Sequence, residues 1–179
     1  MKAPRENEIK LAMADAAAAR AAVERLGAVP RVARCFEDNV LYDDAGHSLA
    51  GRGAVMRLRR AGGHAILTFK GPREVVDGIK QRTELEVEVA DADAAAGILV
   101  ALGLAPVFRY QKYRAVYDWK DVEIVIDETP VGVYLEIEGP PATIHAAAAG
   151  LGKNPSDYIN ESYVALFFAA GGRGDMLFK

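Results

Sequence analysis

The chain has 179 residues, of which 51% are hydrophobic, and its formal net charge is −3. This length suits a single domain with one hydrophobic core. The slight acidity argues against general nucleic-acid binding, which needs a net basic surface, and no apolar run is long enough to span a membrane. We therefore expect neither a nucleic acid nor a membrane as a partner.

The beginning of the sequence and its cysteine content both favour a cytoplasmic location. The first residues are charged and lack an apolar signal region. The single cysteine, Cys35, excludes an intramolecular disulfide and fits a reducing compartment. We interpret Cys35 as a small strand residue and not as a nucleophile, because no histidine lies in a supporting motif.

Two segments of the chain share one layout. In the first, a strand predicted at 6–14 is followed by Asp15, an Ala-rich helix to residue 26, Gly27 and a strand over 30–43. In the second, a strand at 82–90 is followed by Asp91, an Ala-rich helix to residue 102, Gly103 and a strand over 106–118. Aspartate favours helix starts and glycine favours helix ends. We interpret the common spacing as a βαβ-like repeat, with chance spacing of common capping residues as the alternative.

The remaining elements complete an α+β chain. Hairpins are predicted over 55–60 with 64–70 and over 121–127 with 133–138, and helices over 141–150 and from about 155 or 160 to 170. This makes about eight mainly antiparallel strands and four helices in one domain, residues 1–170, followed by a flexible tail over 171–179. Closing removes exposed strand edges, and eight strands leave room for one small ligand. We predict a closed eight-stranded, mainly antiparallel β-barrel with helices 15–26 and 91–102 packed outside.

Charged residues occupy every second position in five of the predicted strands. Alternate residues of a strand share one face, so each run places its charges together. One such strand would be an ordinary solvated strand, but five indicate a sheet closed around a charged interior. The runs are Glu6-x-Glu8-x-Lys10, Arg57-x-Arg59, Arg82-x-Glu84-x-Glu86-x-Glu88, Lys112-x-Arg114 and Glu136-x-Glu138.

A charged interior is costly, so it favours a highly charged ligand. Cations in this number suit an anion with several phosphates. The carboxylates would repel such an anion unless a hard divalent cation lay between them. We also expect the cations to repel one another in the empty site, so that removing one costs little stability.

These runs, in this order, resemble the CYTH family of triphosphate tunnel enzymes, whose named members include class IV adenylyl cyclase and thiamine triphosphatase. The resemblance covers roughly residues 4–170 and includes Thr68-Phe69-Lys70-Gly71-Pro72 and Asp127. It is strongest toward the class IV adenylyl cyclase-like branch, through the segments 43–49, 132–138 and 162–163. Met56 and Val131 depart from the leucines usual there, away from the charged face.

The resemblance implies a triphosphate or nucleoside triphosphate substrate and Mg²⁺ or Mn²⁺ as the cofactor. For each single residue, a structural ion pair across the barrel is the alternative role. The resemblance assigns phosphate binding to Lys10, Arg57, Arg59, Lys70, Arg82, Lys112 and Arg114, metal binding to Glu6, Glu8, Glu84, Glu86, Asp127, Glu136 and Glu138, and catalysis to Glu8, Lys10, Arg59 and Lys112.

We expect a metal-dependent triphosphatase that hydrolyses inorganic or organic triphosphates. One alternative is a class IV adenylyl cyclase that converts ATP to cyclic AMP and pyrophosphate, which needs an adenine pocket that the sequence does not reveal. Tyr110, Tyr134 and Tyr163 could stack on a base, although strand aromatics more often pack. A second alternative is a non-catalytic binder of polyphosphate or nucleotide, which would need fewer carboxylates. The sequence leaves open whether the protein is a monomer or a homodimer.

Overall fold

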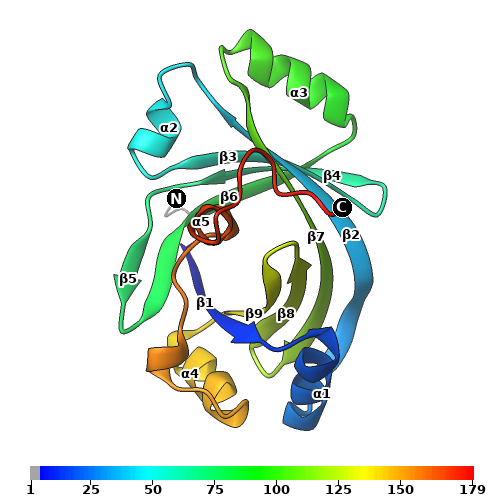
Figure 1. Ribbon diagram of the computed structural model, residues 1–179, viewed down its shortest axis with the longest axis vertical. Helices are drawn as coiled ribbons and strands as arrows, with labels where there is room; N and C mark the ends of the chain where they lie inside the picture. The colour runs from blue at the N-terminus through cyan, green and yellow to red at the C-terminus, as the bar shows by residue number, and fades with distance from the viewer. Residues whose placement is uncertain (1–4) are drawn as a thin grey trace.

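The two longest strands, β2 (Val29–Asp43) and β7 (Ala105–Trp119), pair with each other and form one wall of the sheet. The computed structural model describes residues 5–179, and within them the strand order is β1-β9-β8-β7-β2-β3-β4-β6-β5. A further β1–β6 pairing closes the first eight of these strands into a barrel, seen as a ring in Figure 1. The other strands of the ring are β1 (Arg5–Met13), β3 (Val55–Ala61), β4 (His64–Lys70), β6 (Ile79–Val89), β8 (Val122–Thr129) and β9 (Gly132–Glu138).

All of these pairings are antiparallel, which confirms the predicted closed barrel. The short strand β5 (Glu74–Val76) pairs only with β6 and forms a hairpin beside the ring. Because the ring is closed, alternate residues of every strand point either into the barrel or toward the helices outside it.

Helices cover the outside of the barrel at two places (Figure 1). The helix α1 (Ala16–Leu26) and the helix α4 (Pro141–Gly150) lie near one another, and α3 (Ala92–Ala101) lies on the other side of the ring. The short helix α2 (Ser48–Gly51) was not predicted. The last predicted helix is shorter than expected: α5 spans Tyr163–Ala169, and a separate 3₁₀ turn lies before it at Pro155–Asp157.

The two βαβ segments have the predicted element order, β1-α1-β2 and β6-α3-β7. Asp15 accepts a hydrogen bond from the Ala18 N–H at 2.7 Å, and Asp91 caps α3 in the same way through Asp93 and Ala94. Gly27 and Gly103 follow the two helices with φ of 83° and 84°, a left-handed conformation that glycine adopts without strain. The capping residues therefore act as their spacing predicts.

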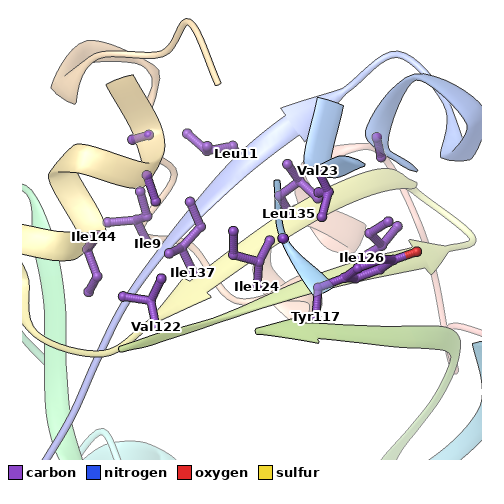
Figure 2. Close-up of a cluster of buried hydrophobic side chains, with 14 of the residues drawn as sticks. Ile9, Leu11, Val23, Tyr117, Val122, Ile124, Ile126, Leu135, Ile137 and Ile144 are labelled. Atoms are coloured by element: carbon purple, nitrogen blue, oxygen red, sulfur yellow. The ribbon is translucent and has the colours of Figure 1, made fainter. Parts of the chain in front are cut away.

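The main hydrophobic core lies outside the barrel, between the sheet and helices α1 and α4 (Figure 2). It contains Ile9 and Leu11 of β1, which flank the inward-facing Lys10. Val23 of α1 and Ile144 of α4 pack against this outer face. The alternation that sends charges inward thus supplies the apolar layer that holds the helices.

The C-terminal segment packs onto the barrel. Met176 is fully buried in a cluster with Phe108, Tyr110, Tyr134 and Tyr163. Its N–H donates to the Arg109 carbonyl at 3.0 Å, and the Gln111 N–H donates to the Met176 carbonyl at 3.0 Å. This docked arrangement differs from the flexible tail predicted over 171–179.

Among residues 5–179, no helix is long and apolar enough to cross a membrane.

The docked segment gives a stability prediction. Met176→Ala should lower the free energy of unfolding by about 2–5 kcal/mol, because it leaves a cavity among aromatic side chains. Denaturant unfolding measures the change, with Lys179→Ala, an exposed neighbour, as the control. Equal stability of Met176→Ala and the parent protein would show that the segment is not packed in solution.

Candidate functional site

The barrel encloses a cavity of about 510 Å³ whose walls carry most of the charges predicted to face inward. This volume lies in the range of small-molecule sites. All seven side chains assigned to phosphate binding line it: Lys10, Arg57, Arg59, Lys70, Arg82, Lys112 and Arg114. The predicted convergence of these cations on one cavity is therefore observed.

Most of the predicted carboxylates share this cavity. Glu6, Glu8, Glu84, Glu86, Glu136 and Glu138 line it. Asp127 lies behind the lining and is fully buried. Glu88 continues the same alternation but lies outside the tunnel, because its side chain is 64% exposed and contacts His64. The run that begins at Arg82 thus leaves the tunnel after Glu86.

Asp127 of β8 is the centre of the most buried ion-pair group. It accepts from the Lys112 Nζ at 3.0 Å and from the Arg114 Nε at 2.8 Å, both on β7. The Tyr163 hydroxyl of α5 donates to the same carboxylate at 2.9 Å. Burial and the neighbouring Asp127 and Glu136 charges raise the pKa of Tyr163, so its hydroxyl keeps its proton. Helix α5 is thereby fixed against the tunnel wall.

A second group joins β1, β6 and β9. The Lys10 Nζ lies 3.0 Å from a Glu136 carboxylate oxygen, and it also lies 4.5 Å from the centre of the Tyr163 ring. Glu8 pairs with Lys80, and both side chains are buried. Burial opposes ionisation of Glu136, but Lys10 and Arg114 hold its pKa well below the usual value. The Glu136 carboxylate is therefore charged at neutral pH.

A third group gathers carboxylates at one mouth of the tunnel, where Glu6, Glu84 and Glu138 lie together with Glu86 and Arg5. Burial and a hydrogen bond with Glu6 raise the pKa of Glu84 to about 7. Burial, together with repulsion from Glu6 and Glu84, raises the pKa of Glu138 to about 7. Burial also opposes ionisation of Glu6, but Glu84, Lys70 and Arg82 lower its pKa to about 2. At neutral pH Glu6 is therefore charged, whereas Glu84 and Glu138 are partly protonated.

Sequence reasoning missed two buried tunnel residues, Lys80 and Glu37. Lys80 lies two residues before Arg82, so extending that alternation backward would have found it. Glu37 of β2 lies 3.5 Å from Arg59 and 3.6 Å from Lys112. Its neighbour Asp38 points outward to Arg109. Because Glu37 and Asp38 are adjacent and both acidic, the sequence of β2 does not show the alternation of charged and apolar residues that marks the other tunnel strands.

The charges of the tunnel balance. With Lys80 and Glu37 included, eight cations face eight carboxylates, and each of these cations contacts a carboxylate. The lining also includes Arg73 and Glu123, one charge of each sign. Some of the expected repulsion between cations is present, because burial together with Arg57 and Arg82 lowers the pKa of Lys70. The ion pairs nevertheless run against the expectation that removing one cation costs little stability. Removing one cation would leave a buried carboxylate without its partner, which is costly.

Two arginines of the tunnel have a buried N–H donor without a hydrogen-bond acceptor among the described residues. Within residues 5–179, the Nε atoms of Arg57 and Arg59 are buried and have no hydrogen-bond acceptor. The Asn39 amide, also fully buried between the β3 and β7 walls, has no partner for either polar atom. Such groups are unusual in folded proteins unless water or a ligand satisfies them.

The acidic mouth has the chemistry that a divalent cation requires. Mg²⁺ and Mn²⁺ prefer carboxylate oxygens, and a cation there would relieve the repulsion that raises the pKa values of Glu84 and Glu138. Across residues 5–179, no three acidic, histidine or cysteine side chains already converge into a metal-binding group. To bind a metal, the carboxylates would therefore have to break their ion pairs with lysine and arginine side chains and reorient.

The sequence profile of the CYTH domain matches residues 4–162. The chain belongs to the CYTH family. Members of this family act on triphosphate substrates, as triphosphatases or as class IV adenylyl cyclases. The chain is also 28% identical over 135 residues to a protein of Methanocaldococcus jannaschii described as a putative adenylate cyclase, over 74% of this chain and 75% of that protein.

Solved structures share the fold. A putative adenylate cyclase from Vibrio parahaemolyticus superposes with a TM-score of 0.82 at 17% identity, over 93% of this chain and 99% of that chain. A Hippeastrum protein, described as a putative adenylyl cyclase with a dominant triphosphatase activity, gives a TM-score of 0.70 at 20% identity, over 94% and 97% of the two chains. At these identities the likeness shows the fold alone.

The Glu37 site gives a pH-dependent stability prediction. Burial opposes ionisation of Glu37, but Lys112, Arg114 and Arg59 lower its pKa to about 2, from an ordinary value of 4.5. A carboxylate with a lowered pKa stabilises the folded state above pH 4.5, and this contribution is lost as the pH falls toward 2. Glu37→Gln should therefore cost on the order of 3 kcal/mol at pH 7.

The difference in unfolding free energy between Glu37→Gln and the parent should shrink below pH 4.5. Denaturant titrations at several pH values measure it, with the exposed Glu24→Gln of α1 as the control. A difference that does not change between pH 7 and pH 3 would contradict the pairing of Glu37 with the tunnel cations.

Proposed function

We propose that the protein is a metal-dependent triphosphatase that hydrolyses inorganic or organic triphosphates inside the barrel. The observation that carries this proposal is the enclosed tunnel in which eight cations, two of them with unsatisfied Nε–H groups, converge on one cavity. A linear triphosphate offers many anionic oxygens in a row, and arginine forks and lysine ammonium groups bind such oxygens well.

The balanced charge of the tunnel supports the metal requirement. A triphosphate would bring several negative charges into a site where the cations already have carboxylate partners. Binding therefore requires an exchange, in which lysine and arginine side chains turn to phosphate oxygens and the released carboxylates hold Mg²⁺ or Mn²⁺. Glu6, Glu8, Glu84, Glu136 and Glu138 are the carboxylates that we assign to this role, directly or through water, with Glu86 and Asp127 holding neighbouring cations or joining the metal site.

Hydrolysis needs positioning and charge stabilisation more than covalent catalysis. When bound, the metal ion neutralises phosphate charge and fixes the phosphate oxygens. Lys10, Arg59 and Lys112 hold the phosphate chain, and the Glu8 carboxylate orients a water toward the terminal phosphorus. The water oxygen bonds to the terminal phosphorus as the bond between that phosphorus and the bridging oxygen breaks. The water gives up a proton to the Glu8 carboxylate, the bridging oxygen leaves with the electron pair on the shortened phosphate chain, and inorganic phosphate is released. The described activity of the Hippeastrum protein, which shares the fold, agrees with this choice.

Substitutions of two neighbouring arginines of β3 can distinguish a role in ligand binding from a role in folding. Arg59 faces the tunnel, whereas Arg60 pairs with Asp93 at 2.6 Å on the outside. Arg59→Ala should weaken tripolyphosphate binding by about 1.5–3 kcal/mol, because it removes a charge-assisted hydrogen bond. Arg60→Ala should bind as the parent protein does.

Calorimetry with tripolyphosphate and Mg²⁺ makes this comparison. Glu37 and Glu86 lose a partner in Arg59→Ala, so we also expect a lower melting temperature for the unliganded variant. If Arg59→Ala unfolds more readily but binds tripolyphosphate with unchanged affinity, Arg59 is a structural ion-pair residue and not a ligand.

Ligand and metal should depend on each other. Tripolyphosphate with Mg²⁺ or Mn²⁺ should raise the melting temperature by more than the sum of the two separate shifts, because each partner neutralises charge that the other brings.

The metal requirement can also be tested through activity. EDTA should abolish phosphate release. Glu136→Gln should lose most turnover, while Glu88→Gln, outside the tunnel, should keep it. Full turnover in excess EDTA would contradict the metal requirement.

A second candidate function, adenylyl cyclase, is favoured by one specific feature of the cavity. One part of its lining is uncharged and made of small or aliphatic residues: Leu41, Ala50, Gly53, Ala54, Val55, Val164 and Ala165. Val55 pairs with Lys70 in the β3–β4 ladder, so this wall adjoins the phosphate-binding cations. Such a wall suits an organic group attached to a triphosphate. All three tyrosines named from the sequence belong to a packed cluster, but Tyr110 and Tyr163 also line the cavity, whereas Tyr134 does not.

Product analysis decides between the candidates. With ATP and Mn²⁺, the triphosphatase releases inorganic phosphate, whereas a cyclase releases cyclic AMP and pyrophosphate. We expect phosphate as the main product. Cyclic AMP in equal amount to pyrophosphate would replace our proposal with the cyclase, and tight binding without any product would replace it with a non-catalytic binder.

A further inference from the structure

The helices of the two βαβ segments differ in the face that they present to solvent. The solvent side of α1 has the charged residues Arg20, Glu24 and Arg25, all exposed. When Asp15 is aligned with Asp91, these positions correspond to Ala96, Val100 and Ala101 of α3. The only charged residue of α3 is Asp93, which pairs with Arg60. The same structural element is thus solvated in one half of the chain and apolar in the other.

The exposed side chains of this region are large as well as apolar. Ile98 is 61% exposed, Val100 is 57% exposed, and Leu102, which ends the helix, is 72% exposed. A helix that is apolar on all sides is ordinarily buried on all sides. Helix α3 packs one side, through Ala95 and Leu99, onto the barrel, which leaves its other side without a partner among the described residues.

The apolar surface continues onto the sheet. Leu67 and Val89 pack against the buried side of α3. Val87, the cross-strand partner of Leu67, is 57% exposed, and the next outward residue of β6, Leu85, is 48% exposed. We call the exposed apolar side chains of this helix and strand the α3 face: Leu85, Val87, Ile98, Val100 and Leu102. Patches of this kind mark interaction sites.

The charge of the α3 face indicates what covers it. A membrane-surface helix needs lysine or arginine beside its apolar residues, and α3 contains neither. A strongly charged protein partner would find no complementary group, since Asp93 already has Arg60. A second copy of the chain presents the same neutral surface and satisfies two-fold symmetry without any charge mismatch. Ala94, Gly97 and Ala101, all exposed, lie three and four residues apart on α3 and would let two such helices approach closely.

We propose that the α3 face is the interface of a homodimer in which the two α3 helices pack against each other. The face lies on the outside of β4 and β6, so the dimer leaves each tunnel to its own protomer. The proposal is independent of the proposed catalytic function.

Sedimentation equilibrium with the full chain tests the dimer. Val100→Glu combined with Ala101→Arg copies the charged pair of α1 onto α3, and it should raise the dimer dissociation constant about 30-fold or more, as expected for substitutions at the centre of an interface. Arg20→Glu on α1, an equally exposed helix position, should leave the dimer intact. A monomeric parent protein, or a dimer that survives the double substitution, would overturn the proposal.

A second measurement does not depend on the folding of the charged variant. Gly97→Cys in a Cys35→Ser background places one thiol per chain on the α3 face. Mild oxidation should produce a covalent dimer in high yield, and Arg20→Cys in the same background should not. Equal cross-linking of the two variants would also overturn the proposal.

Discussion

The pairing of buried charges across a closed sheet is the constraint on which the rest of the structure depends. Lys112 and Asp127 are almost wholly inaccessible to solvent, and leaving either of these buried charges without its partner would be costly. Their strands, β7 and β8, are neighbours in the ring, and Arg114 and Tyr163 complete the group. The barrel therefore has to close in one register, because a slip of one residue would turn these charges into the apolar layer.

This constraint also accounts for the position of the helices. Residues that alternate with the tunnel charges, such as Ile9 and Leu11 beside Lys10, form the outer apolar layer. Helices α1 and α4 cover that layer on one side and α3 covers part of it on the other. The tunnel and the hydrophobic core are thus two faces of the same strands, and a substitution that alters the register of one alters the other. Helix α5, tied to Asp127 through Tyr163, adds a wall to the tunnel.

Much of this arrangement could be predicted from the sequence, because a period of two is a strong signal when it recurs in five strands. The helix boundaries at Asp15 and Asp91 followed from capping chemistry. Helix α2 could not be predicted, because it is only four residues long and depends on the Asp43 carboxylate, which accepts from the N–H groups of Leu49 and Ala50. Met176 could not be placed either, since its contacts come from strand β7, distant in sequence.

The site was predictable where its residues alternate cleanly and was missed where they do not. Glu37 belongs to the tunnel, but its neighbours Phe36 and Asp38 give no clear contrast between the two faces of β2. The pairing of cations with carboxylates was also missed, because the alternation shows which face a charge occupies but not which strand lies opposite. Because of that pairing, a ligand can reach the tunnel cations only by replacing their carboxylate partners.

A crystal structure with tripolyphosphate and Mn²⁺, solved with anomalous scattering, tests this rearrangement most directly. The account predicts an anomalous peak between tunnel carboxylates and phosphate oxygens, with Arg57, Arg59 and Lys112 turned from carboxylate partners to the phosphates. Tripolyphosphate bound outside the barrel, or bound inside it with the ion pairs of the tunnel unchanged and no metal beside it, would contradict the account.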